Sequence, residues 1–245
     1  MRIAANLQWL FTEAAALDRP SLARKAGFEG VEVLSPYDHS PSEWQRALEG
    51  LPVCLINTPG HGGALGMAAV PGSEGQFRAD FTLALTYARA LGAERIHVMA
   101  GKASGAEANL TYRRNLDWAA GQAMGLALTI EPLNAQDMPG YFLNDFDQAA
   151  QVLADLASPG IGLQFDLWHA VRIHGDADAV WDRHMAHATH VQIAGFPNRA
   201  EPCAVAQNHA RRIAAAGYEG WIAAEYAPTG PGRFGWLSSV RNQTI

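Results

Sequence analysis

Eight short runs of strand-forming residues recur along the chain, and Ala- and Leu-rich stretches with helical spacing separate most of them. The runs are almost continuously apolar, which is typical of parallel strands covered on both faces. Strands that alternate with helices in this way indicate an α/β fold with a parallel sheet. The runs are 2–6, 30–34, 53–57, 95–100, 126–131, 161–166, 189–194 and 221–226.

The number of these units distinguishes between two parallel architectures. Eight units in 245 residues average about 31 residues each, which suits a closed (β/α)8 barrel. An open, doubly wound sheet is the rival, but neither a GxGxxG turn after the first strand nor a GxxxxGK[ST] loop is present. We therefore predict a single-domain (β/α)8 TIM barrel over residues 1–245.

Glycines mark the ends of several predicted helices. The clearest helix is predicted over 76–92, where apolar residues share one face and Gly92 ends the helix. Another is predicted over 144–160, with Asn144 as its N-cap.

A short sequence motif that occurs twice supports a repeated structural unit. Segments 26–33 and 216–225 both read Ala-Gly-aromatic-Glu-Gly and then a strand. In each, the first glycine can take the left-handed conformation that ends a helix. We therefore expect a left-handed backbone at Gly27 and Gly217.

Composition and charge exclude several classes of protein. The net charge of −6 and the scattered basic residues argue against a nucleic-acid surface. No segment reaches the roughly 18 apolar residues of a membrane span, and the N-terminus does not resemble a signal peptide. Cys54 and Cys203 form no CxxC pair, and Cys54 lies in an apolar run, which indicates a buried reduced thiol. A cytoplasmic location is the expectation.

Four polar residues stand at the ends of the last four predicted strands. They are Glu131, Asp166, Gln192 and Glu225, spaced 35, 26 and 33 residues apart. The carboxyl ends of barrel strands converge on one mouth, where the active sites of such barrels lie. Three carboxylates and an amide oxygen are hard ligands, which suit Mg²⁺ or Mn²⁺ better than Zn²⁺ or Cu²⁺. The sequence therefore predicts a divalent metal at these four residues.

Other residues of the predicted loops are candidates for substrate contact. His169 follows Asp166 by three residues and would donate to a substrate oxygen, although a hydrogen bond to the backbone is the alternative. Arg199, Glu201 and Lys102 follow strands too, and either cation could bind a substrate carboxylate; for Arg199 a rim salt bridge is the alternative.

Earlier strands carry further polar residues whose role the sequence leaves open. Asn6, Glu32, Asn57 and His97 suit either core packing or substrate contact. The Gly-rich segment 58–75 follows the third strand and is expected to lie over the mouth, as a lid or as a loop without a role. His61 in that segment would enter the site if the loop closed.

A divalent metal flanked by two glutamates suits one class of reaction. An α-hydroxy carbonyl compound chelates such an ion, which acidifies the adjacent C–H. One glutamate removes that proton, and the other returns a proton to the neighbouring carbon. The result is aldose–ketose isomerisation, or epimerisation when the proton returns to the opposite face of the same carbon.

The chain resembles the hydroxypyruvate isomerase family of the xylose-isomerase-like TIM barrels. The motifs that carry the resemblance are IEPLN (130–134), QFDLWH (164–169), HVQIAGFPNRAEP (190–202) and AAEYAP (223–228). It implies isomerisation of hydroxypyruvate to tartronate semialdehyde, or of the homologous 2-oxo-tetronate. It also implies Glu131 and Glu225 as the catalytic pair.

The sequence departs from that family in two loops. In the loop after the seventh strand the family usually has Asp where Gly195 stands, and an acidic residue is missing from segment 203–206. The Gly-rich loop also departs, because segment 58–66 lacks the acidic and Trp residues expected there. These departures leave two alternatives to a small-acid isomerase: a ketose 3-epimerase, and an inactive barrel that binds a small acid or a protein. A homo-oligomer is also an open alternative, because Trp44, Trp181 and Trp236 suit either an interface or helix packing.

Overall fold

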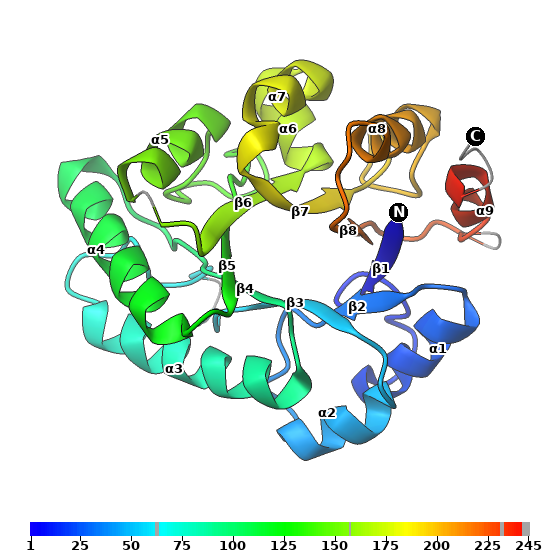
Figure 1. The fold of residues 1–245 in the computed structure, drawn as a ribbon, viewed down its shortest axis with the longest axis horizontal. Helices are drawn as coiled ribbons and strands as arrows, with labels where there is room; N and C mark the ends of the chain where they lie inside the picture. The colour runs from blue at the N-terminus through cyan, green and yellow to red at the C-terminus, as the bar shows by residue number, and fades with distance from the viewer. Residues whose placement is uncertain (62–63, 157, 231–232, 242–245) are drawn as a thin grey trace.

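Eight parallel strands close into one barrel in this computed structural model, with helices around the outside (Figure 1). The structure describes residues 1–61, 64–156, 158–230 and 233–241. Neighbouring strands pair in chain order, and β8 pairs with β1 to close the barrel. The strands are β1 (Arg2–Asn6), β2 (Gly30–Glu32), β3 (Val53–Asn57), β4 (Arg95–His97), β5 (Ala127–Ile130), β6 (Ile161–Asp166), β7 (Ala188–Ile193) and β8 (Trp221–Ala224).

Helices follow the strands and cover their outer faces (Figure 1). Two short 3-10 helices, Ala16–Asp18 and Met185–His187, lie between them. The short α9 takes the place of a full eighth helix after β8. The α-helices are α1 (Arg19–Lys25), α2 (Pro41–Leu48), α3 (Glu74–Leu91), α4 (Gly105–Ala123), α5 (Phe146–Leu156), α6 (Leu167–His174), α7 (Ala177–His184), α8 (Ala204–Ala215) and α9 (Trp236–Arg241). Among the described residues, no helix is long and apolar enough to cross a membrane.

The predicted barrel and all eight predicted strands are confirmed, but several strands end earlier than expected. The sheet pairing of β4 stops at His97, although the apolar run continues to residue 100. The amide of Val98 still donates to Thr129 of β5, but Met99 and Ala100 accept from the loop after β3 instead, with the amide of Ala69 donating to the carbonyl of Ala100 at 2.6 Å. The apolar pattern alone could not separate strand residues from this equally buried loop.

Helix ends confirm two of the glycine predictions and correct one cap. Gly27 and Gly217 have φ values of 94° and 89°, so both adopt the left-handed backbone. The N-cap of α5 is Asp145 rather than Asn144, since the Asp145 carboxylate accepts from two backbone amides, at 2.8 and 3.1 Å. The Asn144 side chain turns back and donates to the carbonyl of Tyr141 instead.

The tryptophans that were considered for an interface belong to the core. Trp44, Trp181 and Trp236 are 2%, 1% and 6% exposed, because they pack between helices and barrel. Helix packing therefore explains all three, and they offer no exposed surface to a second subunit. Cys54 is buried as a free thiol, as predicted.

Segment 58–75 is held against the mouth in its described part. Gly66 pairs with Ala100, and a Cβ on Gly66 would lie 2.2 Å from the carbonyl oxygen of Met99. Only glycine permits this close approach. Gly60 and Leu65 of this segment border the cavity described below, whereas residues 62–63 lie outside the described part of the chain.

Candidate active site

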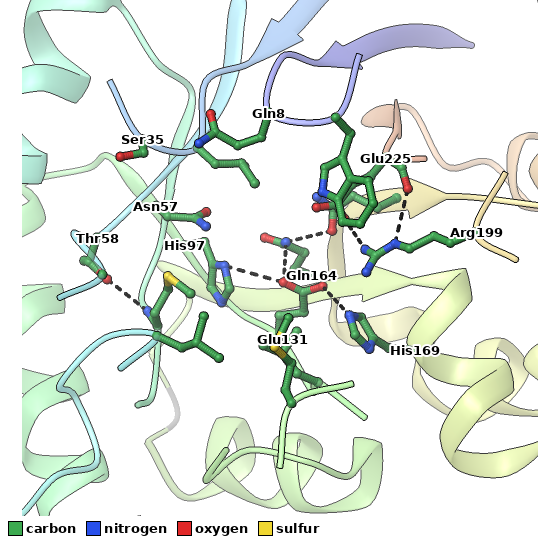
Figure 2. Close-up of a pocket in the computed structure, with 18 residues that line it drawn as sticks. Gln8, Ser35, Asn57, Thr58, His97, Glu131, Gln164, His169, Arg199 and Glu225 are labelled. Carbon is green, nitrogen blue, oxygen red and sulfur yellow. Dashed lines mark hydrogen bonds and ion pairs between the residues drawn. The ribbon is translucent and has the colours of Figure 1, made fainter. Parts of the chain in front are cut away.

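A cavity of about 300 Å³ opens at the carboxyl ends of the barrel strands (Figure 2). The strand ends place Glu131, Gln192 and Glu225 in its wall. Asp166 lies directly behind the wall and is 1% exposed. The four polar strand ends predicted to converge are therefore brought to one mouth, as the barrel geometry requires.

Gln164 joins two of these residues. Its side-chain amide Nε2 donates to Glu131 Oε2 at 2.7 Å and to Gln192 Oε1 at 2.8 Å. Gln164 lies two residues before Asp166 on β6, and residues two apart on a strand face the same side. That alternation was the sequence signal for Gln164, which the sequence analysis missed.

A buried carboxylate sets the orientation of the Gln192 amide. Gln192 Nε2 donates to both oxygens of Glu32, at 3.1 and 3.0 Å. Burial raises the pKa of Glu32 to about 7, while the hydrogen bonds from Gln192 and Asn6 act in the opposite direction. In its ionised form Glu32 only accepts hydrogen bonds, so the amide nitrogen of Gln192 then faces Glu32 and the amide oxygen faces Gln164 and the mouth. Glu32 is fully buried and also accepts from Asn6 and His190. Asn6 and Glu32 thus belong to the packing beneath the site rather than to the cavity wall.

Arg199 lies between two of the acidic residues. Its Nη2 atom donates to Asp166 Oδ2 at 3.0 Å and to Glu225 Oε2 at 2.9 Å. The guanidinium lies 4.6 Å from the ring centroid of Trp9 and 6.0 Å from that of Trp168. A cation between aromatic faces is stabilised by the ring quadrupoles. Arg199 is therefore a fixed part of the site and not a mobile rim residue.

His169 presents an N–H group to the acidic residues. Its Nδ1 atom accepts from the backbone amide of Asn134 at 3.0 Å, so Nδ1 carries no proton. Burial lowers the pKa of His169 to about 3, which leaves the ring neutral, with its single proton on Nε2. Nε2 lies 3.5 Å from Asp166 Oδ2 and 4.0 Å from Glu131 Oε1. His169 is thus a hydrogen-bond donor at the mouth.

Burial raises the pKa of each acidic group in the site. It raises that of Asp166 to about 8 and that of Glu225 to about 7, although Arg199 acts in the opposite direction on both. The pKa of Glu131 is also raised well above its usual value, by burial first and then by the charges of Glu225 and Asp166. One guanidinium is therefore too little positive charge to keep all three carboxylates ionised at neutral pH.

Among the residues that the structure describes, two buried clusters bring together enough ligand atoms to be considered for a metal. In the first, ligand atoms of Glu131, Asp166 and His169 lie within 4.8 Å of one another. The His169 atom on this side carries a proton, so the atoms suited to a cation are oxygens. The carboxylates and the mouth-facing oxygen of Gln192 make an oxygen-rich set, which fits a hard divalent ion.

The second cluster does not fit a metal. It consists of Glu32, Cys54 and His190 beneath the mouth. Arg95 donates to His190 Nδ1 at 3.2 Å, so the other ring nitrogen carries the proton and donates to Glu32. The Cys54 thiol donates to the carbonyl of Val31. The donor atoms of the cluster are already used within the protein.

Three sequence candidates lie away from the cavity. The Lys102 side chain is exposed and does not line the cavity, and its backbone forms a bridge with Tyr141. Glu201 accepts from the backbone amide and the hydroxyl of Thr229, at 2.7 and 2.8 Å, and so ties two loops together. His61 turns toward Asp80 on α3, at 2.8 Å.

The loop after β7 is built around the glycine that departs from the family pattern. A Cβ on Gly195 would lie 2.0 Å from the carbonyl oxygen of Glu201. The amide of Gly195 donates to the carbonyl of Ala200, which closes a tight turn. Arg199 lies in this turn with a φ of 52°. A side chain at position 195 would therefore require the backbone of this loop, which carries Arg199, to shift.

Sequence comparison places the chain among known proteins. It is 40% identical to the 2-oxo-tetronate isomerase of Cupriavidus necator, over 96% of this chain and 97% of that protein. It is 34% identical to the hydroxypyruvate isomerase of Escherichia coli (strain K12), over 93% and 94%.

Structural comparison agrees. A crystal structure titled AP endonuclease, family 2, from Brucella melitensis superposes with a TM-score of 0.91 at 34% identity, covering 98% of both chains. A sequence model of the xylose isomerase-like TIM barrel family matches residues 20–242. The chain therefore belongs to the xylose isomerase-like TIM barrel family.

Proposed function

We propose that this protein is an isomerase of short 2-oxo-3-hydroxy acids, with Glu131 and Glu225 as the proton-transferring pair. The observation that carries the proposal is that both glutamates line one small cavity together with a buried arginine. Relatives along nearly the whole chain are named 2-oxo-tetronate isomerase and hydroxypyruvate isomerase. A cavity of about 300 Å³ suits a small molecule better than a polymer.

The two glutamates suit proton transfer because their surroundings differ. Glu225 pairs with Arg199, whereas Glu131 accepts from the neutral amide of Gln164. Groups with pKa values near neutral pH accept and return protons readily, and burial raises the pKa of Glu225 to about 7. One glutamate removes the proton from the carbon that bears the hydroxyl group. The other delivers a proton to the neighbouring carbonyl carbon, while the proton of the hydroxyl group passes to the former carbonyl oxygen, so that the isomer has the same atoms and charge as the substrate.

Other residues of the site bind and orient the substrate. The Arg199 guanidinium has further N–H groups beyond those used on Asp166 and Glu225, and these can bind the substrate carboxylate. The protonated Nε2 of His169 can donate to a substrate oxygen. Lys102 and Glu201, although candidates from the sequence, have no such role in the proposal because they lie outside the cavity.

The proposed cofactor is Mg²⁺ or Mn²⁺, held by oxygens of Glu131, Asp166, Gln192 and Glu225. When bound, such an ion polarises the substrate carbonyl and stabilises negative charge on the neighbouring oxygens. Cytoplasmic location and the absence of nucleic-acid partners stay predictions from the composition.

A ketose 3-epimerase and an inactive barrel are the alternatives. A D-psicose 3-epimerase from Clostridium cellulolyticum H10 superposes with a TM-score of 0.78 at 15% identity, which is a likeness of fold alone. A neutral ketose has no carboxylate to bind at Arg199, so the buried arginine favours an acid.

The test is proton NMR of the protein, loaded with Mg²⁺ or Mn²⁺, with hydroxypyruvate and with its four-carbon homologue in D₂O. We expect conversion to the isomeric product with deuterium at the newly protonated carbon, and a loss of at least about 10²-fold in Glu225→Gln. Exchange of deuterium on ketoses but not on oxo acids would favour the epimerase. Metal binding without exchange on any of these compounds would indicate an inactive barrel.

A further inference from the structure

The wall of the cavity opposite Arg199 carries buried polar atoms that no protein group satisfies. Figure 2 shows Asn57 and His97 on that side, with Glu131 and Gln164 between them and Arg199. His97 is 1% exposed; its Nε2 has no partner among the described residues, and its Nδ1 faces Glu131 Oε2 at 3.5 Å. The side-chain oxygen of Asn57 is likewise buried without a partner. Buried polar atoms are usually hydrogen-bonded, so these atoms indicate a missing ligand.

The two side chains are held next to each other by the barrel. Asn57 ends β3, His97 ends β4, and the two residues are partners in the parallel register of these strands. Both residues line the cavity. Neighbouring polar groups on one wall can act together on a single ligand group.

Both side chains offer acceptors to that ligand group. His97 Nδ1 lies 3.5 Å from Glu131 Oε2, which places the ring proton on the side of the carboxylate. A neutral imidazole with its proton on Nδ1 leaves Nε2 as an acceptor, and the free atom of Asn57 is also an acceptor. A hydroxyl group can donate its one proton to one of these acceptors and accept a hydrogen bond from the Asn57 side-chain amide, so the pair suits a neutral hydroxyl group.

The orientation of the acid in the proposed function brings a hydroxyl group to this wall. With the carboxylate bound at Arg199 and the reacting carbons C2 and C3 between the two glutamates, a fourth carbon would extend toward the side where Asn57 and His97 lie (Figure 2). Hydroxypyruvate ends at C3. A four-carbon acid carries a hydroxymethyl group on C3 that reaches further along the cavity.

We infer that Asn57 and His97 form a specificity subsite for the terminal hydroxymethyl group of a four-carbon 2-oxo-3-hydroxy acid. The inference rests on the proposed function, since it uses the same cavity and the same orientation of the acid. It makes the four-carbon acid the preferred substrate over hydroxypyruvate.

The test compares kcat/KM for hydroxypyruvate and for 2-oxo-3,4-dihydroxybutanoate, with the full chain loaded with Mn²⁺. We expect the wild type to prefer the four-carbon acid by about tenfold or more, and Asn57→Ala and His97→Phe each to reduce this preference by about tenfold. His97→Gln, which retains an acceptor, is expected to restore part of it. Asn208→Ala on α8, outside the cavity, is the matched control and keeps the wild-type preference.

Two results would overturn the inference. One is a wild type that prefers hydroxypyruvate. The other is a parallel loss on both acids in the variants, which would mean that His97 only positions Glu131. If His97→Phe does not fold, the Asn57→Ala variant tests the subsite by itself, because it removes an acceptor and leaves the contact between His97 and Glu131 intact.

Binding separates this inference from the proposed function. Erythronate and glycerate have no oxo group, so neither can be isomerised. Erythronate has four carbons and glycerate three, so only erythronate has a group that can reach the subsite. Isothermal titration is expected to show about tenfold tighter binding of erythronate, a difference that Asn57→Ala abolishes. Equal affinities in the wild type would refute the subsite even if isomerisation is observed. A difference in affinity without turnover would support the subsite and refute the isomerase.

Discussion

Arg199 Nη2 lies 2.9 Å from Oε2 of Glu225, and the same nitrogen bridges to Asp166 at 3.0 Å. A loop cation thus pairs with acidic groups from the ends of two strands. Trp9 and Trp168 flank the guanidinium, and together they remove it from water. Charge-assisted hydrogen bonds are strongest in such partly dry surroundings.

Replacement of Arg199 by Met is expected to lower kcat/KM by about 10²-fold or more, because the substrate acid and Glu225 lose the same partner. Arg199 lowers the pKa of Glu225, so the variant should shift the acidic limb of the pH–rate profile to higher pH. Steady-state kinetics between pH 5 and 9 check both effects. Arg212→Met, on the outer surface of α8, serves as control. A variant with lower activity but an unshifted acidic limb would contradict this role.

Replacement of Glu32 by Gln removes the acceptor that orients Gln192. The variant amide can donate as well as accept, so the Gln192 amide loses its single orientation and His190 loses a charged acceptor. We expect a loss of stability of about 3 kcal/mol and reduced kcat. Chemical denaturation and kinetics measure the two effects. Glu29→Gln, an exposed carboxylate nearby, should change neither. Wild-type kcat in Glu32→Gln would mean that the orientation of Gln192 is unimportant.

Replacement of Gly195 by Ala is expected to displace the loop that carries Arg199. The added Cβ would lie 2.0 Å from the carbonyl oxygen of Glu201. The backbone of the loop must move to relieve this clash. A destabilisation of about 1–3 kcal/mol and a raised KM for the acid are expected. Gly121→Ala on α4 meets no atom within 4 Å and should stabilise the protein slightly. Calorimetry and kinetics on both variants provide the check. An unchanged KM in Gly195→Ala would mean that position 195 does not control the placement of Arg199.

The metal-free protein is expected to lose stability as the pH rises from 6.5 to 8. The pKa of Glu225 is raised to about 7 and that of Asp166 to about 8, so both bind protons in the folded state that the unfolded chain has already released. A raised acid pKa makes folding less favourable with increasing pH, by at most about 1.4 kcal/mol per pH unit for each carboxyl. Burial lowers the pKa of His97, His169 and His190, and the unfolded chain still protonates part of its histidines near pH 6.5, so these histidines oppose part of the loss at the acidic end of the range.

Thermal unfolding in EDTA and in Mn²⁺ tests this expectation. Bound Mn²⁺ should reduce the loss of stability with rising pH, since a divalent ion keeps the carboxylates ionised in the folded state. Glu225→Gln should flatten the pH dependence of the metal-free protein. A melting temperature independent of pH in EDTA, or indifferent to Mn²⁺, would contradict the electrostatic account of the site.

Much of the fold and of the acidic site follows from the sequence. Near-continuous apolar runs determine buried parallel strands, and eight of them at βα spacing determine a barrel. Since every strand of such a barrel ends at one mouth, Glu131, Asp166, Gln192 and Glu225 had to meet there. These conclusions need only local periodicity and a topological rule.

Contacts between distant segments were decided by the tertiary structure alone. Arg199 and Lys102 look equivalent in the sequence, because each is a cation in a loop after a strand. A tight turn at Gly195 directs Arg199 between Asp166 and Glu225, whereas Lys102 lies on the outside. Side-chain direction in a loop depends on backbone turns and packing partners far away in the chain, which residue spacing does not encode.

The surroundings of Glu32 and His97 were decided in the same way. Both stand on early strands and suited either packing or substrate contact from the sequence. The folded barrel surrounds Glu32 with Asn6, His190 and Gln192, but leaves Nε2 of His97 without a partner among the described residues. The sequence determined which residues reach the mouth, and the three-dimensional packing decided which of them are satisfied there and which await a ligand.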